Sequence, residues 1–509
     1  MSISDVSSRT TQFLQATFSD DCAAIADSIS NQKVEIRLDP DCGRTLDGQL
    51  CFFLVISILI RLDKYCPNLF VSIPALEVHP QLKILGSGNL QDRIREFFNG
   101  MPSLSRAEFA TLSGDGMRLA CSQRGNQRMF NVANHGWAVY WNATAPSPKI
   151  LPNPVGASFA GVLAANEVFK RLLQNKRLRP GNSLHLSDSL VFNTYNYSND
   201  GVNNPDCPQS LNLRDTTFVG LGGVASALLL VLSVFDELDG ATTLIDPDVL
   251  DTSNLNRHLI SSVKDVGRSK VEIASSVLSP NLCCRPVQQR YGRYVADLKE
   301  RRMPLVVISV DHDSIRREVQ SDLPKVILNA GTGDIAWRVS RHTFPNLACL
   351  SCISRADASS EPVLASLAMQ LGLPYNILEQ YWQTKEPISQ RVLESSTRQD
   401  IGDKFALWAG KTLREIRQVM CANPQLLIDS DETVSMPALS ALPGILLASE
   451  LVKELSFPST RPFMNDSKNH FLTSVLSYPS PDQLDVRKKV PDCGCADEAR
   501  QKYYKQKWN

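Results

Sequence analysis

Residues 216–235 read TTFVGLGGVASALLLVLSVF, an apolar run, a glycine cluster and a second apolar run. Gly220, Gly222 and Gly223 stand where a strand would turn into a helix, so backbone N–H groups there could approach a phosphate at the helix N-terminus. Asp246 lies about twenty positions after the glycine cluster, where a carboxylate would bind a ribose hydroxyl. An NAD enzyme would satisfy both features equally well, so they indicate a nucleotide without naming it.

The segment after the second expected strand distinguishes an NAD site from a site that cleaves a nucleoside triphosphate. DTSNLNRHLI carries Asn254 and Arg257 just beyond the strand end, and DVGRSK adds Lys270 at the start of the next helix. A nicotinamide site has no need of Arg and Lys facing the same phosphates, whereas cleavage of a triphosphate does, because charge must be neutralised as pyrophosphate leaves. Asp311 ends the buried strand VVISVD and suits Mg²⁺ beside the phosphates. Each residue alone would be read as a solvated loop charge; the ordered set favours ATP.

Strands and helices alternate through this half of the chain. Strand–helix alternation of this kind predicts a mostly parallel sheet with helices on both faces, an α/β Rossmann-like fold. The expected strands are 216–222, 241–248, 304–311 and 325–332, and the expected helices are 224–238, 270–279 and a helix starting near 314. From 357 to 430 the pattern becomes helical and polar, which indicates an insertion, and residues 496–509 form a charged tail.

The first half is separated from the second by the Asn-, Asp- and Pro-rich residues 195–212, which predict a linker and a boundary near 210. Strands are expected at 34–38, 69–76 and 135–143, with a buried apolar segment at 50–62. Both halves close on a similar segment, GASFAGVLAANEVFKRLL from 156 and ALSALPGILLASELVKEL from 438. We interpret this likeness as a duplication, so that the two halves form a pseudo-dimer; the alternative is that buried helices rich in small residues resemble one another.

Composition narrows the class of protein. A chain of 509 residues predicts two or three domains, and 53 basic residues balanced by 53 acidic ones give no support for nucleic-acid binding. The first residues lack a signal-peptide pattern, and the longest apolar runs are too short to span a bilayer. The 13 cysteines therefore favour free thiols, a metal site or a catalytic thiol over disulfides. We expect a cytoplasmic protein without membrane contact.

Four cysteines stand in two pairs that are far apart in the chain, CLSC at Cys349 and Cys352 and CGC at Cys493 and Cys495. Four thiolates around Zn²⁺ would fix the tail to the second half. Free surface thiols are the alternative.

The motifs GLGGVAS, LIDPDVLDTSNLNRHL, DVGRSKVE and VDHDSIRRE resemble the adenylation domain of ubiquitin-activating enzymes and of their ThiF/MoeB-type bacterial relatives. The nearest whole-chain resemblance is to activating enzymes of bacterial antiviral ubiquitin-like operons (Bil type). The resemblance covers most of 211–495. It implies that Asp246 takes the ribose, that Asn254, Arg257 and Lys270 handle the phosphates, and that Asp311 holds magnesium.

The chain departs from the family pattern at several points. His258 stands where glutamine is usual, and His312 replaces an asparagine. The family's structural zinc normally has two CxxC pairs, and here the second pair is CxC. No RYxRQ segment is present, so the arginine that acts across the dimer interface is unassigned. The first half lacks a glycine loop and resembles an inactive adenylation-like domain.

Cys421 is the candidate nucleophile, because the resemblance places a thiol that takes the acyl group ahead of the closing segment that starts at 438. Arg414 and Arg417, on the same face of the preceding helical segment, could favour its thiolate. A buried structural cysteine is the alternative, and Cys283 and Cys284 are weaker rivals.

These observations predict an activating enzyme that adenylates a ubiquitin-like protein, captures it as a thioester on Cys421 and passes it to a conjugating enzyme, in bacterial antiviral defence. A sulfur-carrier adenylyltransferase without the thioester step, or a catalytically silent scaffold, are the rival readings.

Overall fold

The computed structural model describes residues 8–124, 128–147, 151–179, 182–201, 204–333, 335–344, 346, 348–353, 371–384, 386–396, 408–413, 415–416, 436–462, 468–490 and 493–508. These form two compact units. One contains residues 1–354 and 433–509, and the other contains residues 355–432.

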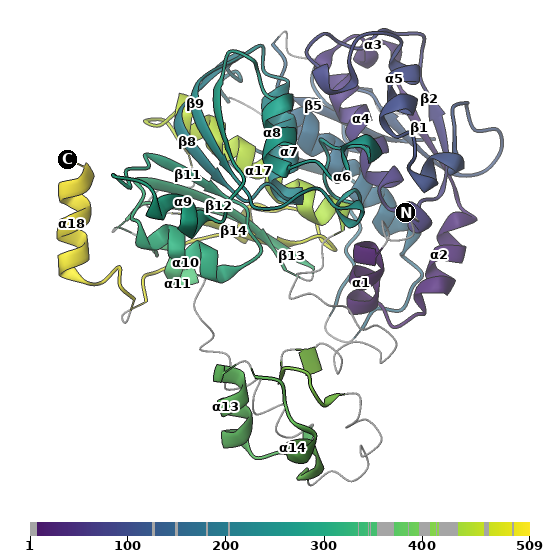
Figure 1. The fold of residues 1–509 in the computed structure, drawn as a ribbon. Helices are drawn as coiled ribbons and strands as arrows, with labels where there is room; N and C mark the ends of the chain where they lie inside the picture. The colour runs from purple at the N-terminus through teal and green to yellow at the C-terminus, as the bar shows by residue number, and fades with distance from the viewer. Residues whose placement is uncertain are drawn as a thin grey trace. The chain divides into compact units, whose positions relative to one another are not determined.

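A seven-stranded sheet forms from the first 200 residues of the larger unit, in the order β3-β2-β1-β4-β5-β6-β7 (Figure 1). The strands are β1 Lys33–Leu38, β2 Asn68–Ser72, β3 Ala107–Glu108, β4 Met117–Cys121, β5 Phe130–His135, β6 Ala138–Trp141 and β7 Leu190–Asn193. The helices are α1 Ser8–Thr17, α2 Cys22–Ser30, α3 Pro40–Gly43, α4 Leu46–Ile60, α5 Leu90–Phe97 and α6 Pro154–Leu172. The apolar segment 50–62 is thus mostly helical, and its helix α4 is buried on all sides.

An eight-stranded sheet follows, in the order β10-β9-β8-β11-β12-β13-β14-β15. Its strands are β8 Ser210–Val219, β9 Glu237–Ile245, β10 Cys283–Val287, β11 Leu305–Ile308, β12 Val326–Thr332, β13 Ala336–His342, β14 His470–Ser474 and β15 Leu484–Asp485. Its helices are α7 Gly223–Ser233, α8 Lys270–Val277, α9 Tyr291–Ala296, α10 Asp313–Ser321, α11 Leu350–Ile353, α17 Pro437–Ser456 and α18 Glu498–Trp508. Short 3-10 turns η4 (Thr252–Asn254) and η5 (Val263–Asp265) lie between β9 and α8.

The two sheets share one topology. In each, the strand that comes first in sequence lies in the middle, its neighbours run parallel to it, and the last strands turn antiparallel. The helices correspond as well: α4 and α7 each follow the first strand, and α6 and α17 each precede the last shared strand. A repeat of strand order, strand direction and helix position is what a duplication predicts.

Two glycines set the same close helix contact in each half. A Cβ on Gly161 of α6 would overlap the carbonyl of Cys51 in α4, and a Cβ on Gly444 of α17 would overlap the carbonyl of Val224 in α7. Only glycine lets the backbones approach this closely. These contacts also give a register between the halves, in which Cys51 corresponds to Val224.

Matching buried ion pairs lie on α6 and α17, where the two halves meet. Glu167 pairs with Lys170, and Glu450 pairs with Lys453, with every side chain almost fully buried. Each lysine also donates to the opposite half: Lys170 Nζ to Ser477 O at 3.1 Å, and Lys453 Nζ to Tyr195 O at 2.8 Å. Burial lowers the pKa of Lys453 to about 8. A buried charge is tolerated only when it is paired and hydrogen-bonded, so these pairs require the two halves to stay docked.

Several of the expected element boundaries were wrong. β8 begins at Ser210, inside the predicted linker, and β9 begins at Glu237, inside the predicted helix 224–238, so α7 already ends at Ser233. The early parts of β8 and β9 pair with each other beyond a β-bulge between Asn212 and Asp215. The start of β8 does alternate, with Leu211 and Leu213 buried between exposed polar residues, but the Asn-, Asp- and Pro-rich sequence before it favoured a linker. In the first half, α6 begins at Pro154, two residues before the closing segment that starts at 156.

The smaller unit contains α13 Tyr375–Thr384 and α14 Gln390–Glu394 and has an apolar core of its own. That core includes Leu371, Leu378, Leu393, Trp408 and Ile416. Cys421, Arg414 and Arg417 lie outside the described residues.

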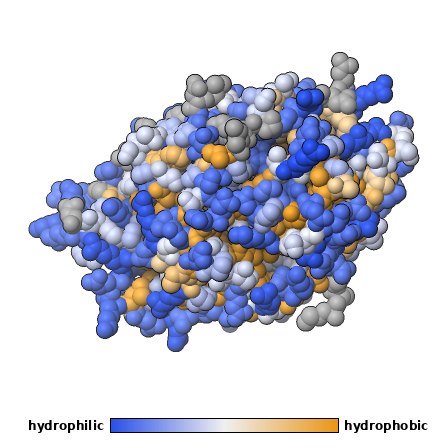
Figure 2. Space-filling model, turned by 90° about the horizontal axis from the view of Figure 1, so that it is seen from above, coloured by the Kyte–Doolittle hydropathy of each residue, from blue (hydrophilic) through white to orange (hydrophobic). Residues whose placement is uncertain are grey.

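Hydrophilic side chains cover most of the face drawn in Figure 2, with hydrophobic residues in small groups between them. Across the part of the chain that the structure describes, no helix is both long and apolar enough to span a membrane.

Candidate active site

The glycine loop lies at the topological switch point of the second sheet, the place where open α/β sheets bind ligands. β8 has β9 on one side and β11 on the other, and the loop follows β8 directly. Gly220 has a φ of +85°, and its backbone packs against Ser309 and Val310 after β11. Gly222 is the N-cap of α7 without a side-chain cap, and a Cβ there would meet nothing within 4 Å. Open space therefore adjoins the first turn of α7, as a phosphate cradle requires.

Asp246 holds the loop from the end of β9. Its carboxylate accepts hydrogen bonds from the backbone N–H of Leu221 at 2.6 Å and of Asp248 at 2.9 Å. Burial raises the pKa of Asp246, and the nearby Lys270 ammonium opposes that rise. Each carboxylate oxygen keeps a second lone pair that can accept from a ribose hydroxyl.

Lys270 begins α8 and reaches back across the site. Its Nζ lies 2.8 Å from Oδ2 of Asp248, and its side chain is largely buried while that of Asp248 is 60% exposed. An ammonium held by a single exposed carboxylate can exchange that partner for a phosphate without leaving a charge buried and unpaired.

Arg257 is the second cation, and it lies close to Asp311. The guanidinium donates to Ser253 O at 3.1 Å and to Asn256 Oδ1 at 3.0 Å. Burial lowers the pKa of Arg257 to about 10, repulsion from Arg9 adds to that effect, and attraction from Asp311 opposes it. Asp311 follows β11 with its carboxylate half exposed, which leaves it open to a metal ion. Asn254 ends η4, and its side chain accepts from the backbone N–H of Asp251.

His258, which stands in place of the usual glutamine, has a structural role in the described site. Its Nε2–H donates to the carbonyl of Leu221 at 3.0 Å, and its Nδ1 accepts from the Ser261 hydroxyl at 2.7 Å. Burial lowers the pKa of His258 to about 3, so the ring is neutral at pH 7. A glutamine amide could donate to the same carbonyl, which explains why the exchange is compatible with the loop. His312 lies at the surface, with Nε2 3.8 Å from Asp311.

Sequence reasoning missed Arg9. It lies on α1 of the first half, is nearly buried, and its charge acts on Arg257. A positive side chain from the first half therefore approaches the second half near Arg257. No motif surrounds it, and only its placement by the fold reveals it.

The corresponding place in the first half is built differently. α4 begins at Leu46, about one turn or ~6 Å earlier than α7 in the register that matches Cys51 with Val224, so helix fills the position of the glycine loop. Thr45 caps this helix through the backbone N–H of Gly48. The first turn of α4 is thus capped by the Thr45 side chain, whereas the first turn of α7 has no side-chain cap.

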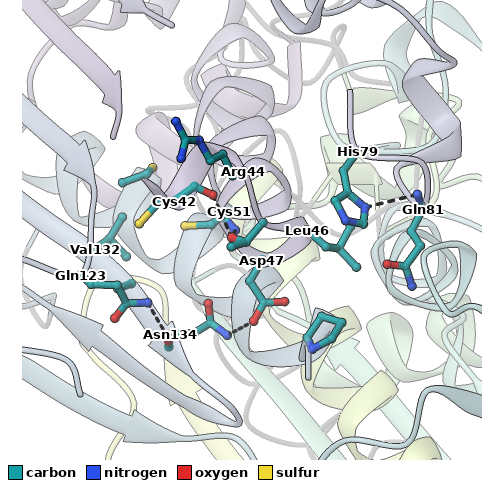
Figure 3. A pocket seen from close by; sticks show the side chains of 15 residues that line it. Cys42, Arg44, Leu46, Asp47, Cys51, His79, Gln81, Gln123, Val132 and Asn134 are labelled. Carbon is teal, nitrogen blue, oxygen red and sulfur yellow. Dashed lines mark hydrogen bonds between the residues drawn. The ribbon is translucent and has the colours of Figure 1, made fainter. Parts of the chain in front are cut away.

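A cavity of about 280 Å³ lies beside this turn. Figure 3 shows Asp47 pointing into it and bonded to Asn134, with Cys42 and Cys51 nearby. Burial raises the pKa of Asp47 to about 6, and hydrogen bonds from Asn134 and from the backbone N–H of Asn153 oppose that rise. An acidic side chain thus stands in the first turn of α4, where α7 has open space, so the cavity does not repeat the candidate phosphate site.

The four paired cysteines come together as predicted from their spacing. Their sulfur atoms all lie within 4.8 Å of one another. The separations are 3.7 Å for Cys349–Cys352, 3.5 Å for Cys349–Cys493 and 3.4 Å for Cys352–Cys495. Tetrahedral Zn–S bonds of about 2.3 Å place sulfurs roughly 3.8 Å apart, so the cluster could hold zinc. The hydrogen bond from Cys349 lowers the pKa of Cys352, which favours the thiolate, the form of cysteine that binds metal.

The tail beyond the cluster packs on the second half. Tyr504 donates to Lys325 O and Trp508 donates to Leu323 O, both at 2.9 Å. These hydrogen bonds fix α18, residues Glu498–Trp508, to the second half.

The rival nucleophiles Cys283 and Cys284 lie at the start of the edge strand β10. Cys283 pairs with Ala241, four residues before Ile245, where the parallel strand β9 ends. At ~3.3 Å per residue, this is about 13 Å from the strand ends that carry the nucleotide residues. Both thiols are thus poorly placed to attack an adenylate there.

Comparisons with known proteins show what this chain is similar to. The model of the ThiF family matches residues 210–495. The uncharacterized protein y4jF of Sinorhizobium fredii is 26% identical over 84% of this chain and 82% of its own. The NEDD8-activating enzyme E1 catalytic subunit of Dictyostelium discoideum is 32% identical over 23% of this chain and 26% of its own. The crystal structure of Escherichia coli MccB aligns over 72% of this chain and 95% of its own, with 13% identity and a TM-score of 0.35. Because the family match covers more than half of its length, the chain belongs to the ThiF family.

Proposed function

We propose that this chain binds ATP with Mg²⁺ at the end of the second sheet and adenylates the C-terminal glycine of a ubiquitin-like protein. The observation that carries the proposal is the convergence of Arg257, Lys270, Asp246 and Asp311 on the open N-terminus of α7. The similarity of one segment to a NEDD8-activating subunit supports a ubiquitin-like substrate.

In the proposed reaction a carboxylate oxygen of the substrate attacks the α-phosphorus of ATP. The bond between that phosphorus and the bridging oxygen breaks, giving an acyl-adenylate and pyrophosphate. Asp246 binds the ribose, while Asn254, Arg257 and Lys270 contact the phosphates and stabilise the charge that develops on pyrophosphate. Asp311 would hold Mg²⁺, which offsets the phosphate charge when bound.

We assign the missing arginine from across the interface to Arg9, because its charge already acts on Arg257. The first half, residues 1–210, would then be an inactive adenylation-like domain, and the chain would function as a pseudo-dimer. The active domain would be 211–495, with the insertion at 357–430. Cys349, Cys352, Cys493 and Cys495 would hold one structural Zn²⁺, which fixes α18 to the sheet.

The later steps also belong to the proposal. Cys421 would attack the acyl-adenylate, releasing AMP, and pass the resulting thioester to a ubiquitin-conjugating-like enzyme. We place the reaction in the cytoplasm, where ATP and reduced thiols coexist, and in antiviral defence. A sulfur-carrier adenylyltransferase is the second candidate, because the described site accounts for adenylation alone.

One experiment separates these possibilities. With a ubiquitin-like partner present, Cys421→Ala should keep ATP–pyrophosphate exchange and lose the reductant-sensitive band on a non-reducing gel. Asp311→Ala should lose both. A thioester that persists in Cys421→Ala refutes the nucleophile assignment. The absence of a thioester in the wild type, with exchange intact, favours the sulfur-carrier reaction, and the absence of exchange favours the scaffold.

A further inference from the structure

A second arginine of the first half reaches into the nucleotide half. Arg61 directly follows α4, and its Nη2 donates to Ser261 O at 2.7 Å, while its Nη1 donates to Leu255 O. These two carbonyls flank the segment that contains Arg257 and His258. The Arg61 guanidinium therefore binds both ends of a short segment. This segment contains Arg257, the proposed phosphate contact, and His258, which donates to the glycine loop.

Arg61 is held there without a counter-ion among the described residues. Its side chain is 1% exposed, its Nε donates to the Ser57 hydroxyl at 3.1 Å, and its guanidinium carbon lies 5.7 Å from the Phe98 ring centroid. A buried cation that is satisfied only by neutral groups costs free energy, which an apolar side chain at the same place would avoid.

The positive charge of Arg61 also acts within the site. It contributes to the low pKa of His258, although burial is the larger cause there. A polyphosphate bound near Arg257 would gain from this charge, because Coulomb interactions weaken little across a buried, low-dielectric region.

The segment has a second support from the same half. A Cβ on Gly100, whose φ is +88°, would lie 3.3 Å from the side chain of Val263, just beyond the carbonyl of Ser261. The first half thus touches the segment 255–263 at both ends, through Arg61 and through Gly100.

We infer that Arg61 is a positioning residue for ATP: by binding the carbonyls of Leu255 and Ser261 it orders the segment 255–261 and so fixes Arg257 for the phosphates. The inference rests on the proposed nucleotide site. It gives the first half a role in the chemistry beyond that of a docked, inactive partner.

The first test measures the segment in the absence of nucleotide. Arg61→Met keeps much of the side-chain volume and removes all donors, and Arg61→Lys keeps the charge but lacks the planar fork that spans two carbonyls. Hydrogen exchange of full-length protein should be at least tenfold faster across 254–263 in both variants, with α4, α6 and α17 unchanged. If the Met variant does not fold, the Lys variant decides. Wild-type protection of this segment in Arg61→Lys would overturn the inference.

The second test measures binding of Mg²⁺–ATP by calorimetry. Both variants should bind at least tenfold more weakly than the wild type. Arg106→Met is the matched control, because Arg106 also donates to two backbone carbonyls, Lys64 O and Cys66 O, but both lie within the first half. It should leave the affinity unchanged. Equal weakening in the control, or wild-type affinity in Arg61→Lys, would overturn the inference. A wild-type protein that binds no ATP refutes the proposed function instead, and hydrogen exchange still tests the positioning.

Discussion

Replacing Gly222 by alanine should weaken ATP binding strongly while leaving the fold intact. Gly222 has φ −78° and ψ −156°, which alanine adopts without strain, and its Cβ would meet no protein atom within 4 Å. Alanine is a poorer N-cap than glycine, at a cost of about 0.5–1 kcal/mol, but it lowers the entropy of the unfolded chain by a similar amount. The free energy of unfolding should therefore change by less than about 1 kcal/mol.

The effect on the ligand is larger. The new methyl would project into the space beside the first turn of α7, where the phosphates must approach the backbone N–H groups. A hydrogen bond from an amide to a charged oxygen contributes about 1.5–3 kcal/mol. Loss of one such bond weakens binding roughly 10- to 150-fold.

Calorimetric titration of Mg²⁺–ATP into wild type and Gly222→Ala, beside thermal melts of both, measures the two effects separately. Gly223→Ala provides the contrast, because its Cβ would lie 2.9 Å from Cγ of Arg257 and 3.0 Å from Oγ of Ser440. It should lose both affinity and stability. Wild-type affinity in Gly222→Ala would refute the phosphate cradle.

Three further outcomes are expected. Purified protein should contain about one Zn²⁺ per chain, and changing Cys493 and Cys495 to serine should release it and lower the melting temperature; retained zinc contradicts the four-thiolate site. Lys453→Met should lower the free energy of unfolding, measured in denaturant, by about 3–5 kcal/mol, because Glu450 stays buried without its cation; an unchanged midpoint contradicts this. His258→Gln should retain ATP affinity and reduce the loss of melting temperature between pH 7.5 and 5; an unchanged loss contradicts the histidine's role.

The sign of the pH effect follows from His258 itself. Its pKa in the native protein is about 3, below the ordinary value of 6.5. Between these values the unfolded chain binds a proton that the folded chain does not, so stability falls as the pH falls through this window. The contribution is on the order of a few kcal/mol.

The α/β fold of the second half could be predicted well, because its motifs are local in sequence. The glycine loop, Asp246 and the segment around Arg257 each follow a buried strand, and parallel strands bring their carboxyl ends to one edge. The four-cysteine cluster was also predictable, because cysteine pairs with short spacing are strong metal signals. The structure adds that Asp246 and Arg257 both contact the glycine loop.

The contributions of the first half could not be predicted in the same way. Arg9 and Arg61 carry no motif, and each acts on a residue about 200 positions or more away. Only the docking of α6 on α17 brings them there. The sequence indicated Arg61 only weakly, as the one charged residue near the end of the apolar segment 50–62. The seven-stranded sheet was underestimated as well, because β3, β4, β5 and β7 were not expected. β3 has only 2 residues and β7 only 4, and strands this short show little alternation.

The most direct test of the central claim is exchange of labelled pyrophosphate into ATP, catalysed by the purified chain with a ubiquitin-like protein that ends in glycine. We predict exchange that requires Mg²⁺ and the free C-terminal carboxylate of that protein, persists in Cys421→Ala and disappears in Asp311→Ala. Exchange that continues in Asp311→Ala at the wild-type rate, or that proceeds when the terminal carboxylate is amidated, would contradict adenylation at this site.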